Sequence, residues 1–84
     1  MTYSVKIKAS AAKALRKFPP ADRRRLLGAI DRLARTPTAG SVLKGEFAGL
    51  RRLRVGRYRI IYEVFESELT VLVVRVAQRQ NAYR

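Results

Sequence analysis

Arginines alternate with apolar residues in the C-terminal half of the sequence, and this spacing could build a site for an anion. In a β-strand, residues two apart point to the same face. Arg52 and Arg54 would therefore share one face of a strand, while Leu53 and Val55 share the other. The guanidinium group binds phosphate through two parallel hydrogen bonds, and arginine outnumbers lysine by 14 to 5. The pattern predicts recognition of phosphate groups.

The composition excludes several other kinds of site. The 84 residues include 19 Lys and Arg against 6 Asp and Glu, a formal net charge of +13, with neither Cys nor His. A thiolate nucleophile, a His-based catalytic triad and zinc sites built on Cys or His are therefore excluded. Scattered acidic residues are also a poor basis for a carboxylate metal cage, so we expect no metal and no cofactor. The charge indicates a polyanionic partner: nucleic acid, an anionic membrane or an acidic protein.

The N-terminal half has the pattern of a strand followed by a helical hairpin. Apolar and polar residues alternate over residues 3–7, as in a half-buried strand. Ser10 is a candidate N-cap for a first helix, and Pro19-Pro20 ends that helix because proline lacks the N–H that a helix needs. A second helix is expected from about Ala21 to Arg35. Its apolar stripe comprises Leu26, Leu27, Ile30, Leu33 and Ala34.

Three strands are expected in the C-terminal half, at about residues 50–55, 57–65 and 69–78, with Gly56 in the first turn. The order β-α-α-β-β-β predicts a single α+β domain over residues 1–84, with the helix hairpin on one face of a small, mainly antiparallel sheet. The apolar side of each strand should meet the helices: Leu53 and Val55; Tyr58, Ile60, Tyr62 and Val64; Leu72, Val74 and Val76. The other face would collect Arg52, Arg54, Arg59, Arg75 and Arg79.

Solvated strand residues, kept for solubility and edge protection, are the alternative interpretation of these arginines. This interpretation explains the five arginines as a set less well than it explains any one of them. Like charges that face each other across a sheet repel by up to roughly 1 kcal/mol per pair. Glu63 can compensate only one or two of them. A further basic run, Arg23-Arg24-Arg25 with Arg32, is typical of a solvated helix face. It could also extend an RNA footprint or receive an acidic partner.

Two segments resemble the RelE/ParE toxin superfamily. They are LRRLRVGRYRIIYE, from Leu50 to Glu63, and VRVAQRQNAYR, from Val74 to Arg84. Weaker matches are ALRKFP at residues 14–19 and LKG at residues 43–45. The resemblance covers essentially the whole chain and implies the family's β-α-α-β-β-β order.

The resemblance implies the toxin of a type II toxin–antitoxin system. In its RelE-like branch the toxin is a metal-independent endoribonuclease that cuts mRNA in the ribosomal A site and so inhibits translation. The implied partners are a cognate antitoxin with an acidic or amphipathic segment, mRNA and the ribosome, with operator DNA bound only through the antitoxin complex. No membrane is expected, and the expected location is the cytoplasm. Two alternatives stay open: a ParE-like toxin that poisons DNA gyrase without RNase activity, and a catalytically weak, basic RNA-binding member.

Carried over by position, the resemblance implies catalytic roles for Arg59, Arg79 and Tyr83. The resemblance and the strand pattern together indicate the RNA- and phosphate-binding residues: Arg52, Arg54, Arg75, Arg57 and Lys44. Other RelE-like toxins have lysine where this chain has Arg52 and Arg54, and arginine is not deprotonated in proteins. The phenol of Tyr83, with an ordinary pKa of about 10, is then the candidate base. The alternatives are catalysis by electrostatics and positioning alone, and a purely structural Tyr83 that anchors the C-terminal tail.

Overall fold

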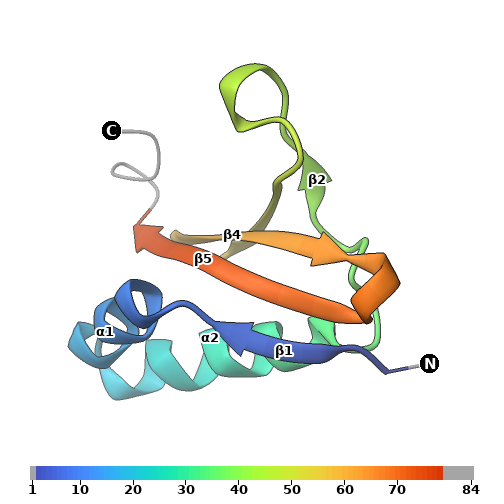
Figure 1. The fold of residues 1–84 in the computed structure, drawn as a ribbon. Helices are drawn as coiled ribbons and strands as arrows, with labels where there is room; N and C mark the ends of the chain where they lie inside the picture. Colours follow the sequence, from blue (N-terminus) through green and yellow to red (C-terminus); the bar gives the residue numbers. More distant parts are fainter. Residues whose placement is uncertain (1, 79–84) are drawn as a thin grey trace.

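The computed structural model describes residues 2–78 as two helices packed on one face of a five-stranded sheet (Figure 1). The helices are α1 (Ala9–Lys17) and α2 (Pro20–Leu33). The strands are β1 (Ser4–Ile7), β2 (Ser41–Val42), β3 (Arg51–Val55), β4 (Tyr58–Phe65) and β5 (Thr70–Gln78). The 3₁₀ turns are η1 (Gly45–Phe47) and η2 (Glu66–Glu68). The strand order is β1-β5-β4-β3-β2, in which β1 runs parallel to β5 and the other pairs are antiparallel. The predicted fold class is confirmed.

The first helix begins directly where the first strand stops pairing. The Lys8 N–H donates to the Val73 carbonyl at 2.9 Å, which extends the parallel pairing of β1 to this residue. Lys8 is consequently the N-cap, and Ser10 lies inside the helix. The prediction that Ser10 caps α1 was wrong because the strand pairing, and not a side-chain hydrogen bond, sets the start of the helix.

Proline and the apolar stripe shape α2. Pro20 is the first helical residue, where its missing N–H costs no helical hydrogen bond. Leu26, Ile30 and Leu33 are buried as expected, but Leu27 is 43% exposed. One residue is about 100° of rotation around a helix, so Leu27 falls beside the stripe, and Ala29 is buried instead.

A phenol buried in the core ties β2 to the sheet. β2 has only two residues, too few to show an alternation, and it was not predicted. The Tyr62 hydroxyl donates to the Pro37 carbonyl (2.7 Å) and accepts from the Gly40 N–H (2.8 Å). A Cβ at Gly40 would lie 2.7 Å from both the Arg52 carbonyl oxygen and the Tyr62 hydroxyl, so the close approach requires glycine. This contact holds the chain that leads into β2.

An irregularity in β5 changes which residues face the helices. Tyr62 pairs with Val73 while its neighbour Ile61 pairs with Arg75, so Val74 is an extra residue in β5. The buried residues are therefore Val71, Val73 and Val76. The expectation that Leu72 and Val74 meet the helices was wrong, because a bulge shifts the two-residue alternation by one. The expectation for Val76 is confirmed.

Candidate functional site

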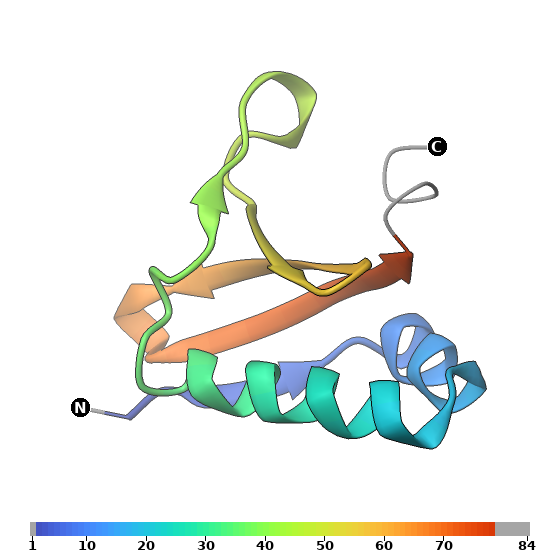
Figure 2. The same cartoon turned by 180° about the vertical axis from the view of Figure 1, so that it is seen from behind.

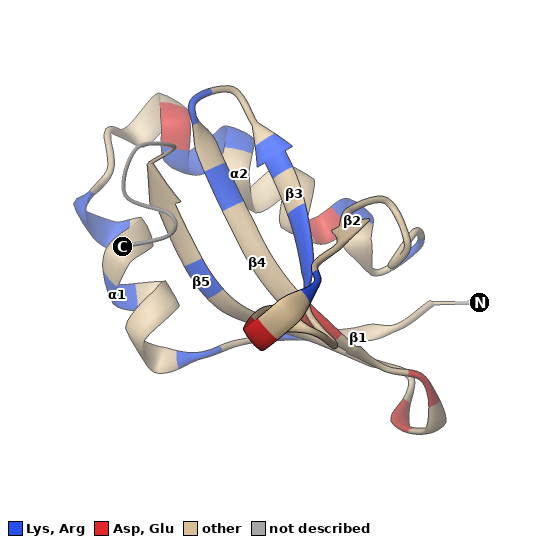
Figure 3. Ribbon diagram, turned by 90° about the horizontal axis from the view of Figure 1, so that it is seen from above, with Lys and Arg blue, Asp and Glu red and all other residues tan. Residues whose placement is uncertain are grey.

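Arginines from three neighbouring strands share the face of the sheet that the helices leave open. Arg54 of β3 lies directly opposite Arg59 of β4. Ile61 of β4 lies opposite Arg52 on one side and Arg75 on the other. Residues that oppose each other across a sheet point to the same side. We call Arg52, Arg54, Arg59 and Arg75 the arginine face; Figure 3 shows basic residues along β3, β4 and β5 in the view from above, with the helices behind.

An apolar residue lies in the middle of the arginine face. Ile61 is only 6% exposed, yet it is not part of the core cluster that β4 forms with the helices. Side chains on its own face must therefore cover it, and its direct neighbours across the strands are Arg52 and Arg75. Long arginine side chains cover apolar surface with their stems and keep the charged group in water. Ile61 thus gives the flanking arginines a surface to lie on.

One pair of like charges on the arginine face is unfavourable without an anion. Arg54 and Arg59 face each other, and like charges in this position destabilise a sheet by up to roughly 1 kcal/mol. On β4, Glu63 is the one acidic residue that shares this face with Arg59 and Ile61. A bound phosphate would replace repulsion by charge-assisted hydrogen bonds. The arrangement is suited to binding a phosphodiester.

The other predicted binding residues occupy different places. Arg57 lies in the turn between β3 and β4, where its guanidinium is 3.6 Å from Asp22 of α2, and it is directed away from the arginine face. Asp22 also accepts a hydrogen bond from the Tyr58 hydroxyl (2.7 Å). Lys44 is exposed directly before η1, in the segment 43–50 that rises on the side of the sheet opposite the helices (Figures 1 and 2). Arg79 and Tyr83 lie outside the described residues.

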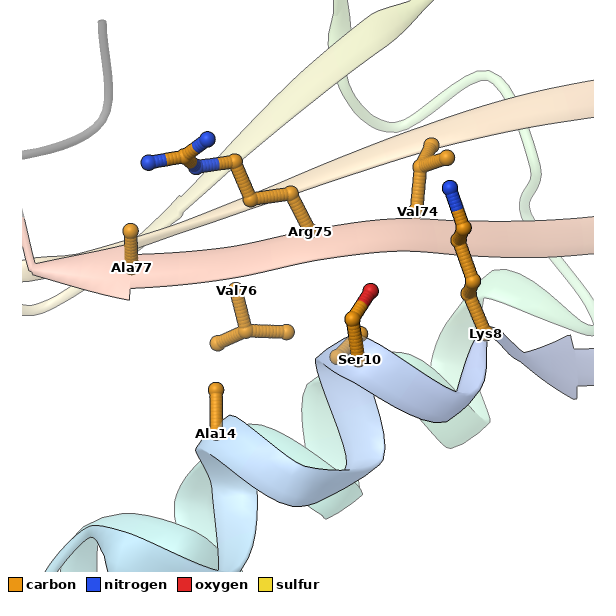
Figure 4. A pocket seen from close by; sticks show the side chains of 8 residues that line it. Lys8, Ser10, Ala14, Val74, Arg75, Val76 and Ala77 are labelled. Carbon is orange, nitrogen blue, oxygen red and sulfur yellow. The ribbon is translucent and has the colours of Figure 1, made fainter. Parts of the chain in front are cut away.

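A hollow of about 370 Å³ adjoins the arginine face between α1 and β5 (Figure 4). It exists because β1 pairs only with Thr70–Val73, which leaves the rest of β5 next to the first turn of α1. Lys8, Ser10 and Arg75 give it polar groups, and the remaining lining is small and apolar. The sequence pattern did not indicate Lys8 or Ser10, since only the parallel pairing of β1 with β5 brings them near Arg75. The cationic surface therefore continues from the arginine face to the start of α1.

Each tyrosine that the structure describes belongs to the core. Tyr58 and Tyr62 are in the core cluster, and Tyr3 packs against it. Burial raises the pKa of Tyr62, outweighing the Gly40 hydrogen bond and the nearby Arg51 charge, which lower it. Among residues 2–78, no phenol lies on the arginine face.

Within the described part of the chain, no three acidic side chains come together in a way that could hold a metal ion. No helix there is both long and apolar enough to cross a membrane. Neither finding bears on Arg79 and Tyr83, which fall beyond that part.

Comparison with known proteins gives a consistent result over the whole chain. Residues 5–83 match the family described as the ParE toxin of the type II toxin–antitoxin system parDE. Toxin RelG of Mycobacterium tuberculosis is 34% identical over 90 aligned residues, which cover 100% of this chain and 99% of that protein. The chain therefore belongs to the ParE toxin family of type II toxin–antitoxin systems, and the resemblance to the RelE/ParE superfamily is confirmed.

Solved structures agree with this assignment. The toxin–antitoxin complex RelBE2 of M. tuberculosis contains a chain with a TM-score of 0.87 and 32% identity, covering 94% of this chain and all of its own. The archaeal RelE–RelB complex of Pyrococcus horikoshii has a chain with a TM-score of 0.79 and 36% identity, covering 98% of this chain and 100% of its own. Isolated Escherichia coli RelE, at 19% identity and a TM-score of 0.79, shares the fold; the match covers 96% of this chain and 88% of that one.

Proposed function

We propose that this toxin is a ribosome-dependent mRNA endoribonuclease that a cognate antitoxin neutralises. One observation carries the proposal: Arg54 and Arg59 face each other on the open side of the sheet, with Arg52 and Arg75 beside them. This set of guanidiniums fits the phosphate backbone of RNA, which is the polyanion that a RelE-like toxin cuts. The similarity to RelE chains over nearly the full length supports the same activity.

The chemistry needs no group beyond the RNA and the protein side chains. The 2′-oxygen of one nucleotide attacks the adjacent phosphorus, its proton is removed, and the bond to the 5′-oxygen of the next nucleotide breaks. The 5′-oxygen takes up a proton, and the upstream fragment ends in a 2′,3′-cyclic phosphate. The transition state carries extra negative charge on the phosphate oxygens, and fixed cations next to these oxygens stabilise it. In the proposal, Arg59 and Arg54 bind those oxygens while Arg52 and Arg75 hold the neighbouring phosphates.

Proton transfer is assigned to the C-terminal residues. Arg52 and Arg54 remain protonated and cannot accept the proton of the 2′-hydroxyl. Tyr3, Tyr58 and Tyr62 belong to the core, which leaves the fourth tyrosine of the sequence, Tyr83, as the candidate base. Arg79 is proposed to bind the phosphate or the leaving 5′-oxygen. Both assignments rest on the family resemblance and on elimination.

A cognate antitoxin is the proposed regulatory partner. The similar chains from M. tuberculosis and P. horikoshii come from complexes of a toxin with its antitoxin. With a net charge of +13, this chain would attract an acidic segment, whose affinity should fall as salt is added. An affinity that stays constant from low to high salt would instead indicate a mainly hydrophobic interface.

Primer extension on a ribosome-bound message tests the activity. The wild-type protein should cut within the A-site codon, and Arg59→Gln should cut about 10²–10³-fold more slowly because one group that stabilises the transition state is lost. Arg16→Gln removes one exposed charge from α1, outside the arginine face, and should cut like wild type. A wild-type protein that leaves the message intact, or an Arg59→Gln variant as active as wild type, would contradict the proposal.

A second candidate function follows from the family that matches the sequence. The description of that family names the ParE toxin of parDE. The resemblance to the ParE-like branch implies a toxin that acts on DNA gyrase. A supercoiling assay with purified gyrase separates the two functions. Inhibited supercoiling together with an intact ribosome-bound message would favour the gyrase function.

A further inference from the structure

A second cationic hollow lies on the helix side of the sheet, between α2 and the end of β3. Figure 2 shows α2 running below the sheet in this region. The hollow has a volume of about 350 Å³. We call it the α2 groove; it is lined by Arg24, Arg25, Gly28, Ala29, Arg32 and Val55. The arginine face described above does not use any of these residues.

Within the described part of the chain, the charges of the α2 groove lack acidic partners. Arg24, Arg25 and Arg32 are exposed, and none of them forms an ion pair with another residue in the range 2–78. Asp22, the acid at the start of α2, already holds Arg57 and the Tyr58 hydroxyl. Mutual repulsion of guanidiniums around one hollow is relieved by an anion that enters it.

The three guanidiniums of the α2 groove are spaced along the axis of α2. Arg24 and Arg32 are two helical turns apart on α2, which corresponds to about 12 Å along the helix axis. The guanidinium of Arg25 lies over the β3–β4 turn, and its Nη2 would be 3.1 Å from a Cβ at Gly56. The packing of this guanidinium against the β3–β4 turn limits its freedom. An extended anion lying along α2 would meet Arg24 and Arg32 in succession, with Arg25 at its side.

Glycine at position 28 is the most informative residue of the groove. Glycine inside a helix costs about 1 kcal/mol relative to alanine. Nothing lies within 4 Å of a Cβ built at Gly28, and its φ is not positive, so neither packing nor backbone conformation within the described chain requires glycine there. The missing side chain leaves the backbone between Arg24 and Arg32 accessible, as at sites where a ligand approaches the main chain closely.

We infer that the α2 groove is a second anion site, which binds phosphates of an RNA strand while the arginine face binds another segment. Protein partners are usually held by central aromatic or aliphatic anchors, whereas the only apolar side chains in this lining are Ala29 and the half-buried Val55. Spaced guanidiniums along an open groove instead match the repeated charge of a nucleic acid backbone. The inference deepens the proposed function and rests on it for the identity of RNA as the polyanion.

Two measurements with the full chain and a short oligouridine test the inference. Amide chemical shifts locate the binding, and fluorescence anisotropy measures its affinity over a range of salt concentrations. In the wild type we expect two separate sets of shifted amides, one along β3, β4 and β5 and one around Gly28 and Val55. The double variant Arg24→Gln/Arg32→Gln should lose the second set, bind at least about fivefold more weakly, and show a salt slope smaller by about 1.4.

Matched variants distinguish specific binding in the α2 groove from a general effect of positive charge on affinity. Arg16→Gln/Lys17→Gln removes the same charge from exposed positions of α1 and should keep the set around Gly28. Gly28→Leu fills the groove without a change in charge and should weaken binding, while Gly28→Ala should raise Tm and bind nearly as well as wild type. Thermal unfolding of each variant shows that the fold is kept.

Several outcomes would overturn the inference: no shifts around Gly28 in the wild type, full binding by Gly28→Leu, or equal losses in the two double variants. Shifts around Gly28 that follow only from an acidic antitoxin, and not from oligouridine, would assign the groove to a protein partner. These results do not depend on cleavage. A failed ribosome assay with intact shifts around Gly28 would therefore reject the proposed activity while leaving the groove in place.

Discussion

The two faces of the sheet put neighbouring, chemically identical residues to different use. Ile60 and Ile61 follow each other on β4 and are 0% and 6% exposed. Ile60 belongs to the core that the helices cover, whereas Ile61 lies on the arginine face between Arg52 and Arg75. Alternation along one strand thus separates residues that hold the fold from residues that support the charged face.

Polar groups differ between the faces in the same way. On the helix side, the hydroxyls of Tyr58 and Tyr62 are both hydrogen-bonded, to Asp22 and to the 36–40 loop respectively. On the open side, Arg54 faces Arg59, another cation. These two hydroxyls are therefore satisfied within the protein, while the Arg54–Arg59 pair on the open side keeps a repulsion that a ligand can relieve. This difference supports the proposal that the open side binds the phosphates of RNA.

Alanine at the two isoleucines should produce the largest contrast. Ile60→Ala leaves a cavity in the packed core and should lower the free energy of unfolding by about 3–4 kcal/mol. Ile61→Ala should cost only about 1–2 kcal/mol, because arginine stems can move into the space. The same variant should slow RNA cleavage by loosening Arg52 and Arg75. Urea unfolding of both variants measures the difference, and equal costs would show that Ile61 is packed as rigidly as the core.

Tyr62 should give the next largest effect, with a defined dependence on pH. Tyr62→Phe leaves the Gly40 N–H and the Pro37 carbonyl without their partner and should cost about 1–3 kcal/mol at neutral pH. Burial raises the pKa of the folded Tyr62 above its ordinary value of 10.0, so the folded state favours the neutral phenol. The stability that this group contributes is complete below pH 10.0 and is lost as the pH rises toward the folded pKa.

Unfolding in urea at pH 7 and near pH 11 checks the sign of this effect. The difference in free energy of unfolding between wild type and Tyr62→Phe should be smaller at the higher pH. Tyr3→Phe is the control at the edge of the core and should change stability by no more than about 0.5 kcal/mol. A gap that widens with rising pH would mean that the folded protein stabilises the ionised phenol.

The parts of the fold that follow local patterns could be predicted, and the rest depends on pairing. Every second residue from Tyr58 to Val64 is apolar, so the apolar face of β4 was predicted correctly, and with it the outward direction of Arg59. In β5, residues 71–74 are all apolar, so the sequence shows neither which of them face the helices nor where the bulge lies. β2 is too short to show a pattern, and its position depends on the Tyr62 hydroxyl and the space at Gly40.

The candidate site divides in the same manner. Arg52, Arg54, Arg59 and Arg75 were placed on one face by alternation, and the strand register puts them there. Lys8 and Ser10 lie next to Arg75 through a parallel pairing between the two ends of the chain, which no local pattern contains. The position of Arg57 depends on Asp22, which is far away in the sequence and comes near Arg57 only through the tertiary packing of α2.

Charge reversal at Arg54 should give the smallest change in stability and the most direct test of the two faces. Glu opposite Arg59 replaces a repulsive pair by an attractive one, so Arg54→Glu should raise the free energy of unfolding by about 1 kcal/mol at low salt. The gain should shrink at high salt, because the side chain at position 54 is exposed to solvent. Arg16→Glu, an exposed change on α1, should stay within about 0.5 kcal/mol of wild type.

The same variant should cleave ribosome-bound mRNA more slowly, because the new carboxylate repels the phosphate that Arg59 is proposed to bind. A protein that becomes more stable as it loses activity has its like charges arranged for a ligand and not for the fold. If Arg54→Glu lowers stability, Arg54 already has a compensating role within the protein, and the repulsion that distinguishes the open face from the helix side would not exist. Urea unfolding and the cleavage assay on one preparation decide between these results.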